Sequence, residues 1–319
     1  MHQARAAAAA EQDGLAGKRD WLFTAQGDPR GYIQPQRLRE LWFHTGTVCN
    51  LACPFCLEGS RPGDDRLNRI LFSDAQPWID EAVELGVGQF SFTGGEPFVI
   101  KDMVRILDYA LNFNPCLVLT NATDPLLKRL QEVESLLGKP HPASFRVSLD
   151  YSDRKRHDAG RGEGNFDKAL QGLDELHRRG FPVSVARQME KGEDRETVER
   201  GYRQVFVQAG LPEDLRIVPF PDFLTPGAQD RAEVPQITQD CMTRYQSAEA
   251  RAAFMCNFSK MVIKQDGRMR VYACTLVDDD PDYDQGGSLR DSLSKRVMLK
   301  HHRCYSCFAF GSSCSETSR

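Results

Sequence analysis

The chain has 319 residues and a formal net charge of −4 at pH 7, with acidic and basic residues interspersed. This length suits one large α/β domain with a small second one, and the charge pattern gives no basic footprint for nucleic acid. No apolar run reaches the length of a membrane span, and the alanine-rich start lacks the pattern of a signal peptide. We therefore expect a cytoplasmic protein without membrane contact, in which ten cysteines indicate metal or redox chemistry rather than disulfides.

The residues before about Gln36 are polar and loop-like, so we expect residues 1–37 to be a flexible extension. After them, apolar strand-like runs alternate with helical segments that begin at capping residues and end near glycines. The expected strands are residues 41–44, 89–92, 116–120, 144–149, 183–187 and 215–219, and the expected helices are 73–85, 101–111, one opening at 124, 166–177 and 196–208. Six strand–helix repeats imply a parallel sheet. Because six is short of eight, we expect a partial, TIM-like barrel over residues 38–235.

The loop after the first expected strand holds three cysteines, Cys49, Cys53 and Cys56, in the spacing C-x3-C-x2-C. Three thiolates can hold three irons of a cubane cluster and leave the fourth iron open to a small chelating ligand. Further along, residues 93–97 read Thr-Gly-Gly-Glu-Pro directly after an apolar strand. A partial zinc site and a disulfide knot are the alternatives, but structural zinc takes four ligands and nothing marks the chain as secreted.

At these residues the sequence resembles the radical S-adenosylmethionine (radical SAM) superfamily, whose motif is C-x3-C-x-aromatic-C, with Phe55 at the aromatic place. The resemblance implies a (β/α)6 core and a 4Fe–4S cluster on the three cysteines. It also implies that SAM chelates the open iron and is cleaved reductively to a 5′-deoxyadenosyl radical, which abstracts hydrogen from substrate.

The same resemblance implies which residues contact SAM. The backbone of Phe55 would touch adenine, and the Gly-Gly-Glu turn would hold the methionine ammonium. The further candidates lie at strand ends, where family members contact the ribose and carboxylate. The full set is Phe55, Gly94, Gly95, Glu96, Asn121, Ser148, Asp150 and Arg187. An ordinary turn residue is the alternative for Asn121, and a solvated charge is the alternative for Arg187.

Cysteines return after residue 235, where the α/β rhythm stops, and we expect residues 236–319 to form a small cysteine-rich domain. Cys256 and Cys274 bracket a hairpin-like segment with an Asp-Gly turn, which would bring their thiols together. Cys304 and Cys307 could complete a four-thiolate site, for which zinc and an iron–sulfur cluster both fit.

The order of cysteine, hairpin, cysteine and C-x2-C resembles the SPASM/Twitch extension of radical SAM enzymes. This resemblance implies one auxiliary 4Fe–4S cluster, and Cys314 is a further candidate ligand. We interpret Cys241 as a structural thiol and Cys116 as a core residue inside a strand.

An auxiliary cluster with all its positions filled suits electron transfer, so the resemblance implies an oxidoreductase-like reaction. Our first hypothesis is oxidation of a small molecule or natural-product intermediate. The alternative is a maturase that modifies a ribosomally made peptide or protein. A non-catalytic iron–sulfur or zinc protein would be expected to carry a fourth cysteine near Cys56. We also expect a reducing partner such as flavodoxin or ferredoxin. The general base stays unassigned, with His44, His157 and Glu58 as candidates.

Overall fold

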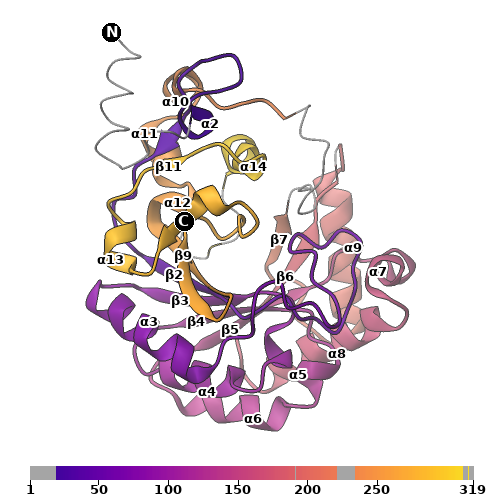
Figure 1. The fold of residues 1–319 in the computed structure, drawn as a ribbon. Coiled ribbons are helices and arrows are strands. Elements are labelled where there is room, and N and C mark those ends of the chain that lie inside the picture. The colour runs from indigo at the N-terminus through magenta and orange to yellow at the C-terminus, as the bar shows by residue number, and fades with distance from the viewer. Residues whose placement is uncertain (1–18, 191, 221–233, 312–314, 316–319) are drawn as a thin grey trace.

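The computed structural model describes residues 19–190, 192–220, 234–311 and 315. Its main feature is a nine-stranded sheet in the order β10-β9-β8-β2-β3-β4-β5-β6-β7 (Figure 1). These strands are β2 (Glu40–His44), β3 (Gln89–Thr93), β4 (Cys116–Thr120), β5 (Ala143–Ser148), β6 (Val183–Gln188), β7 (Ile217–Phe220), β8 (Ser259–Gln265), β9 (Arg268–Tyr272) and β10 (Asp284–Gly286).

The α-helices of the described residues include four that follow strands of the sheet, namely α3 (Phe72–Glu84), α4 (Met103–Ala110), α8 (Asn165–Arg178) and α9 (Arg195–Gln208). The others are α2 (Arg19–Leu22), α5 (Asp124–Leu127), α6 (Leu130–Glu134), α7 (Arg154–Arg161), α10 (Gln239–Arg244), α11 (Ala248–Ala252), α12 (Met255–Phe258), α13 (Leu289–Ser292) and α14 (Arg303–Phe310). Short 3-10 turns are η1 (Pro97–Val99), η2 (Ser135–Gly138) and η4 (Pro281–Tyr283).

Strands β2 to β7 all run parallel to their neighbours, and the helices between them lie along one face of the sheet (Figure 1). Alternate side chains of the strands point into this helix-covered face, where Phe43 and Phe92 stack with ring centroids 5.4 Å apart. The predicted α/β partial barrel is confirmed. Because parallel strands end at the same edge, the loops that follow them meet there.

The C-terminal residues continue this sheet. Strand β8 pairs in parallel with β2 and forms an antiparallel hairpin with β9. The hairpin turns at Asp266 and Gly267, whose φ angles of 50° and 73° are those of the tight turn that the Asp-Gly pair predicts. The hairpin thus brings the C-terminal cysteines against the barrel. The division of the chain at residue 235 stays a prediction.

The described part of the N-terminal segment packs against these C-terminal residues. Trp21 is 4% exposed and meets the ring of Tyr283 edge-on at 5.1 Å, while β1 (Tyr32–Ile33) pairs with β11 (Val297–Met298). The expected flexible extension therefore does not describe residues 19–33, because apolar burial and strand pairing hold them.

None of the helices in the described ranges is long and apolar enough to cross a lipid bilayer.

Candidate active site

A pocket opens at the edge of the sheet where the parallel strands end. Its lining comes from the ends of six successive strands, β2 to β7, and the loops that follow them. The lining includes all the predicted ligands of this region except Glu96, namely Cys49, Cys53, Phe55, Cys56, Gly94, Gly95, Asn121, Ser148, Asp150 and Arg187. Residues far apart in the sequence are thus brought to one site.

The three cysteines of the first motif lie in the loop after β2, and we call residues 49–58 the cysteine loop. The N–H of Cys56 donates to the carbonyl of Cys53 at 3.1 Å, so both belong to one tight turn. Cys49 is buried, and its sulfur accepts from the N–H of Leu51 at 3.4 Å. Burial raises the pKa of the Cys49 thiol to about 12. In the metal-free protein this thiol therefore keeps its proton, which a metal must displace.

The turn after β3 packs its backbone against the start of the cysteine loop. The N–H of Gly95 donates to the carbonyl of Gly46 at 2.8 Å, and the N–H of Glu96 donates to that of Val48 at 3.1 Å. A Cβ atom at Gly95 would lie 2.2 Å from the Val48 carbonyl oxygen, and Gly94 has a φ of 133°. Only glycine allows this close approach, which fixes the Gly-Gly turn beside the cysteines.

Glu96 is buried and is not among the residues that line the pocket. It accepts hydrogen bonds from the N–H groups of Phe98 and Asn121, at 3.2 and 2.8 Å, and from the Thr120 hydroxyl at 2.8 Å. Burial raises its pKa to about 7, although these donors favour the ionised form. The expectation that this carboxylate meets the methionine ammonium stays a prediction. Glu96 ties the end of β3 to the end of β4.

Asn121 follows β4 and faces the cysteine loop. Its amide nitrogen donates to the side-chain oxygen of Asn50 at 3.0 Å and approaches the sulfur of Cys49 at 3.9 Å. Its amide oxygen accepts from Thr123. The side chain thus links the loops after β2 and β4, and it is more than an isolated turn residue.

Asp150, just beyond β5, forms a two-point ion pair with Arg161 of α7, at 2.5 and 3.0 Å. This pairing raises the pKa of Arg161 against the opposing effect of burial. The sequence did not single out Arg161, because an arginine at the end of a helix is common and its partner lies eleven residues away. Ser148 lines the same wall at the end of β5.

Arg187 lines the pocket and is 3% exposed, so it is not a solvated charge. Its guanidinium already has a carboxylate partner, Glu193, with nitrogen–oxygen distances of 2.5 and 2.9 Å. The predicted contact of Arg187 with a carboxylate of SAM or substrate stays a prediction. The partner in this structure belongs to the chain itself.

Phe55 packs against α7. A Cβ atom at Gly160 would lie 2.3 Å from Cε1 of the Phe55 ring, and the Arg161 guanidinium lies 5.8 Å from the centre of that ring. The ring therefore fills a space that the small residue at position 160 leaves open. Phe55 lines the pocket together with the two partly exposed cysteines, Cys53 and Cys56.

Residues 43–205 match the sequence profile described as the radical SAM superfamily, which is more than half of the chain. The chain belongs to the radical SAM superfamily. Members of this superfamily are enzymes that bind a 4Fe–4S cluster and SAM. All the residues that line the pocket, except Phe220, lie within this matched range, and we call the pocket the radical SAM site.

Curated relatives match less than half of this chain. Mycofactocin maturase MftC of Mycolicibacterium smegmatis is 32% identical over 134 residues, which are 42% of this chain and 33% of that protein. The subtilosin biosynthesis protein AlbA of Bacillus subtilis is 32% identical over 140 residues, 43% of this chain and 30% of that protein. A probable GTP 3′,8-cyclase of Methanopyrus kandleri is 30% identical over 143 residues, 43% of each. The chain thus spans less than half the length of these relatives.

Solved structures with a similar fold cover more of this chain than the curated relatives do. SuiB of Streptococcus suis bound to SAM has a TM-score of 0.59 at 15% identity, over 81% of this chain and 66% of that one. SuiB bound to its precursor peptide SuiA has a TM-score of 0.58 at 14% identity, over 81% of this chain and 65% of that one. At this identity the likeness shows the fold.

The second set of cysteines is buried in the C-terminal part of the chain. Four of them, Cys256, Cys274, Cys304 and Cys307, belong to one apolar core, and each is at most 9% exposed. Burial raises the pKa of the Cys304 thiol to about 12, and the neighbouring Cys274 adds to this. Thiols are the ligands that zinc and iron–sulfur clusters take, so this core supplies the ligand type for either. Cys314 lies outside the described residues.

The two cysteines interpreted as structural occupy ordinary positions. Cys116 is buried in β4, with its sulfur 3.8 Å from the carbonyl of Asn114. Cys241 lies in the first turn of α10, where its sulfur accepts from the hydroxyl of the capping residue Thr238 at 3.2 Å. Neither lines the radical SAM pocket.

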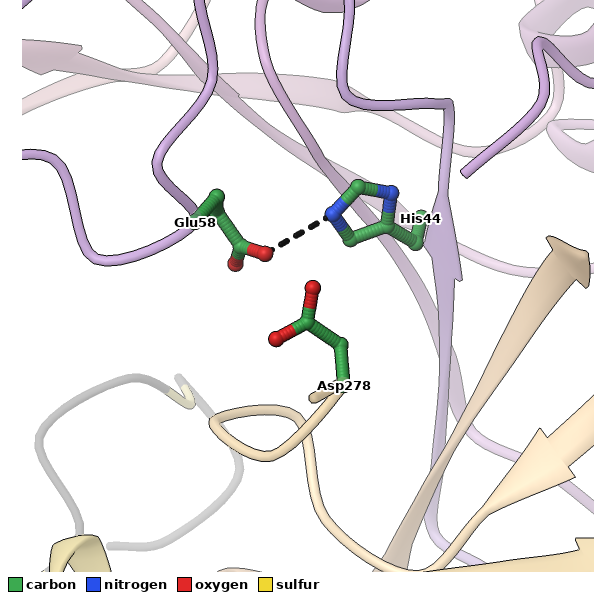
Figure 2. Close-up of side chains that lie close together, drawn as sticks. All are labelled: His44, Glu58 and Asp278. Carbon is green, nitrogen blue, oxygen red and sulfur yellow. Dashed lines mark hydrogen bonds and ion pairs between the residues drawn. The ribbon is translucent and has the colours of Figure 1, made fainter. Parts of the chain in front are cut away.

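His44, Glu58 and Asp278 form a cluster whose potential ligand atoms lie within 4.8 Å of one another (Figure 2). The Nδ1 atom of His44 accepts from the N–H of Gly46 at 3.2 Å, so the ring proton is on Nε2 and donates to Glu58 at 2.9 Å. A metal would need the Nε2 lone pair. Without a metal, the Nε2 atom is thus engaged by Glu58, and His44 and Glu58 form a hydrogen-bonded pair beside Asp278.

Among the three candidates for the general base, Glu58 alone lines the pocket in the described structure. His44 is fully buried behind it. His157 is 1% exposed, and its Nδ1 atom accepts from the N–H of Asp150 at 3.2 Å. Both histidines therefore have structural roles. Glu58 remains as the candidate for the general base, and its carboxylate already accepts a hydrogen bond from His44.

Proposed function

We propose that this radical SAM enzyme holds its SAM-binding cluster on Cys49, Cys53 and Cys56. The observation that carries the proposal is that these three thiols and the Gly-Gly turn share one pocket at the strand ends. When bound, the cluster supplies the electron that splits SAM into methionine and a 5′-deoxyadenosyl radical, which takes a hydrogen atom from substrate. The chain shapes the pocket around these ligands.

Each other SAM-site residue has a proposed part. The backbone of the Gly-Gly turn approaches the methionine end of SAM, and the backbone of Phe55 lies beside adenine. Asn121 and Ser148 offer polar groups to the ribose and carboxylate. Asp150 and Arg187 act through their ion pairs, which hold the pocket walls in place. Glu96 positions the turn from behind.

We infer that the four buried C-terminal cysteines hold an auxiliary 4Fe–4S cluster, with Cys314 as a further candidate. With all its positions filled, such a cluster would supply an electron acceptor for the oxidation, and a base would take the proton. The net reaction is an oxidation in which the substrate loses two hydrogens. The first electron comes from a low-potential cytoplasmic donor such as flavodoxin or ferredoxin.

We propose a peptide or protein as the substrate. Two of the relatives named above are a maturase and a bacteriocin biosynthesis protein, and the SuiB fold accommodates a precursor peptide. The charged side chains that line the described pocket are paired within the chain, as Arg161 with Asp150, Arg187 with Glu193 and Glu58 with His44. The remaining wall includes Leu51, Leu57, Leu119 and Phe220. Such a wall suits an uncharged side chain.

A small molecule is the second candidate. It headed the sequence-based hypotheses, and the likeness to a GTP 3′,8-cyclase favours it. The two candidates are separated by adding fractions of deuterium-labelled cell extract to the enzyme with SAM and dithionite. We expect deuterium in 5′-deoxyadenosine only with the peptide fraction. Transfer from the small-molecule fraction alone would contradict the peptide proposal.

Two sets of variants test the cluster sites. The triple variant C49A/C53A/C56A should make no 5′-deoxyadenosine yet keep the C-terminal iron. The double variant C304A/C307A should lose about four irons per chain, one cluster's worth. C116A is the matched control, because it removes a buried thiol that lines neither site. Retained SAM cleavage in the first variant, or unchanged iron in the second, would overturn the corresponding assignment.

A further inference from the structure

A single buried side chain touches the loops of both cysteine sites. Arg303 begins α14 directly before Cys304 and is 2% exposed. Its Nη2 donates to the carbonyl of Leu57 at 2.6 Å, and its Nη1 donates to the carbonyl of Leu276. Leu57 follows Cys56 in the cysteine loop. Leu276 lies two residues after Cys274 and donates its N–H to that cysteine's sulfur at 3.4 Å.

A second arginine strengthens the same connection. Arg66 donates from Nη2 to the carbonyl of Glu58 at 3.0 Å and to the carboxylate of Asp278 at 2.6 Å. The other carboxylate oxygen of Asp278 lies 3.9 Å from Nη1 of Arg303. Two consecutive carbonyls of the cysteine loop are thus held by guanidinium groups that share Asp278, a residue of the C-terminal part.

The cysteine loop depends on such contacts to hold its shape, because residues 49–58 contain no helix or strand. A guanidinium is planar and always charged, and its N–H groups leave in fixed directions. Once the C-terminal cysteines bind metal, the backbone at Arg303 and at its acceptor Leu276 is fixed, because each lies within two residues of one of these cysteines. The direction in which the guanidinium donates is then fixed as well. The constraint then reaches Leu57 and Cys56.

We propose that Arg303 is a positioning residue that couples the two cysteine sites, so that metal on the C-terminal site slows the loss of the cluster from the radical SAM site. The inference rests on the proposed function, since it needs metal at both sites. It assigns to Arg303 no contact with SAM or substrate.

The test compares R303Q with R30Q. Arg30 is also buried, at 6% exposure, and donates to the carbonyl of Phe23 at 2.9 Å, but none of its described hydrogen bonds reaches residues 56–58. The measurement is the rate at which EDTA removes the SAM-site cluster, followed by the electron paramagnetic resonance signal of the reduced protein with SAM. Each variant is made with an intact C-terminal site and in the C304A/C307A background.

We expect R303Q to speed cluster loss about tenfold, equivalent to 1.4 kcal/mol, when the C-terminal site is intact. In the C304A/C307A background, where coupling is already lost, we expect less than a twofold effect. R30Q should leave the rate unchanged in both. Equal effects of R303Q and R30Q, or an equal effect of R303Q in both backgrounds, would overturn the inference.

Two further measurements keep these outcomes distinct. If C304A/C307A loses no iron, the proposed auxiliary cluster fails before the arginine variants are compared. If R303Q does not fold, R303K keeps the charge beside Asp278 but lacks the two-pronged fork, and the same comparison is made with it. Hydrogen exchange of amides 57–61 in metal-free protein should rise in R303K and not in R30Q, and unchanged exchange would also count against the coupling.

Discussion

Replacement of Gly95 by alanine tests how the radical SAM site is built. The new Cβ atom would lie 2.2 Å from the carbonyl oxygen of Val48 and 2.8 Å from that of Thr47. Both obstacles are backbone atoms, which cannot rotate away as a side chain can. The turn after β3 must therefore separate from the cysteine loop.

The size of the effect follows from the contacts that separate. The hydrogen bonds from Gly95 to Gly46 and from Glu96 to Val48 contribute about 1 kcal/mol each. Overpacking of a closely fitted site costs a further 1 to 3 kcal/mol or so. The total, about 3 to 5 kcal/mol, is within the stability of most domains, so we expect a folded protein with a displaced loop.

The assay combines urea unfolding with iron content and the rate of 5′-deoxyadenosine formation. We expect G95A to keep the C-terminal iron and to lose SAM cleavage by at least about a hundredfold, because 3 kcal/mol shifts a loop equilibrium by roughly that factor. G88A is the control, since its Cβ would lie 3.5 Å from the nearest carbonyl, an ordinary contact. SAM cleavage by G95A within twofold of the wild type would refute the reasoning.

Three further predictions concern charges around the pocket, each measured by urea unfolding. Burial raises the pKa of Glu96 from 4.5 to about 7, so the free energy of unfolding should fall by about 3 kcal/mol as the pH rises through this range, and E96Q should lack that slope. D150N should cost about 2 to 3 kcal/mol by leaving Arg161 unpaired; a loss below 1 kcal/mol would contradict this. Burial lowers the pKa of His157 from 6.5 to about 4, so stability should fall as the pH drops through that window, and an equally steep fall in H157Q would exclude this cause.

The sequence predicted the parts of the site that depend on short-range patterns. The C-x3-C-x2-C spacing, the Gly-Gly turn and the polar residues after strands each follow from a few adjacent residues. Parallel strands then bring their ends together without further information, and the pocket contains Cys49, Asn121 and Asp150 as expected. The Asp-Gly pair likewise predicted the hairpin that follows Cys256.

What the sequence did not reveal depends on which side chains pair with one another in the fold. The direction of the Glu96 carboxylate is set by donors on the neighbouring strand, and Arg187 is occupied by Glu193 from a later loop. The same limit applies to Asp278, which begins a run of three aspartates and yet is 3% exposed. The packing of Trp21 against Tyr283 was also missed, because one aromatic residue in a polar segment has no periodic pattern.

The most direct test of the account is the content of iron, sulfide and zinc per chain in anaerobically reconstituted protein, followed in the same sample by 5′-deoxyadenosine formation with SAM and dithionite. Two 4Fe–4S sites predict about eight irons and eight sulfides, no zinc, and formation of 5′-deoxyadenosine. About four irons with one zinc would remove the electron acceptor and contradict an oxidation. The absence of SAM cleavage in iron-loaded protein would contradict the central claim.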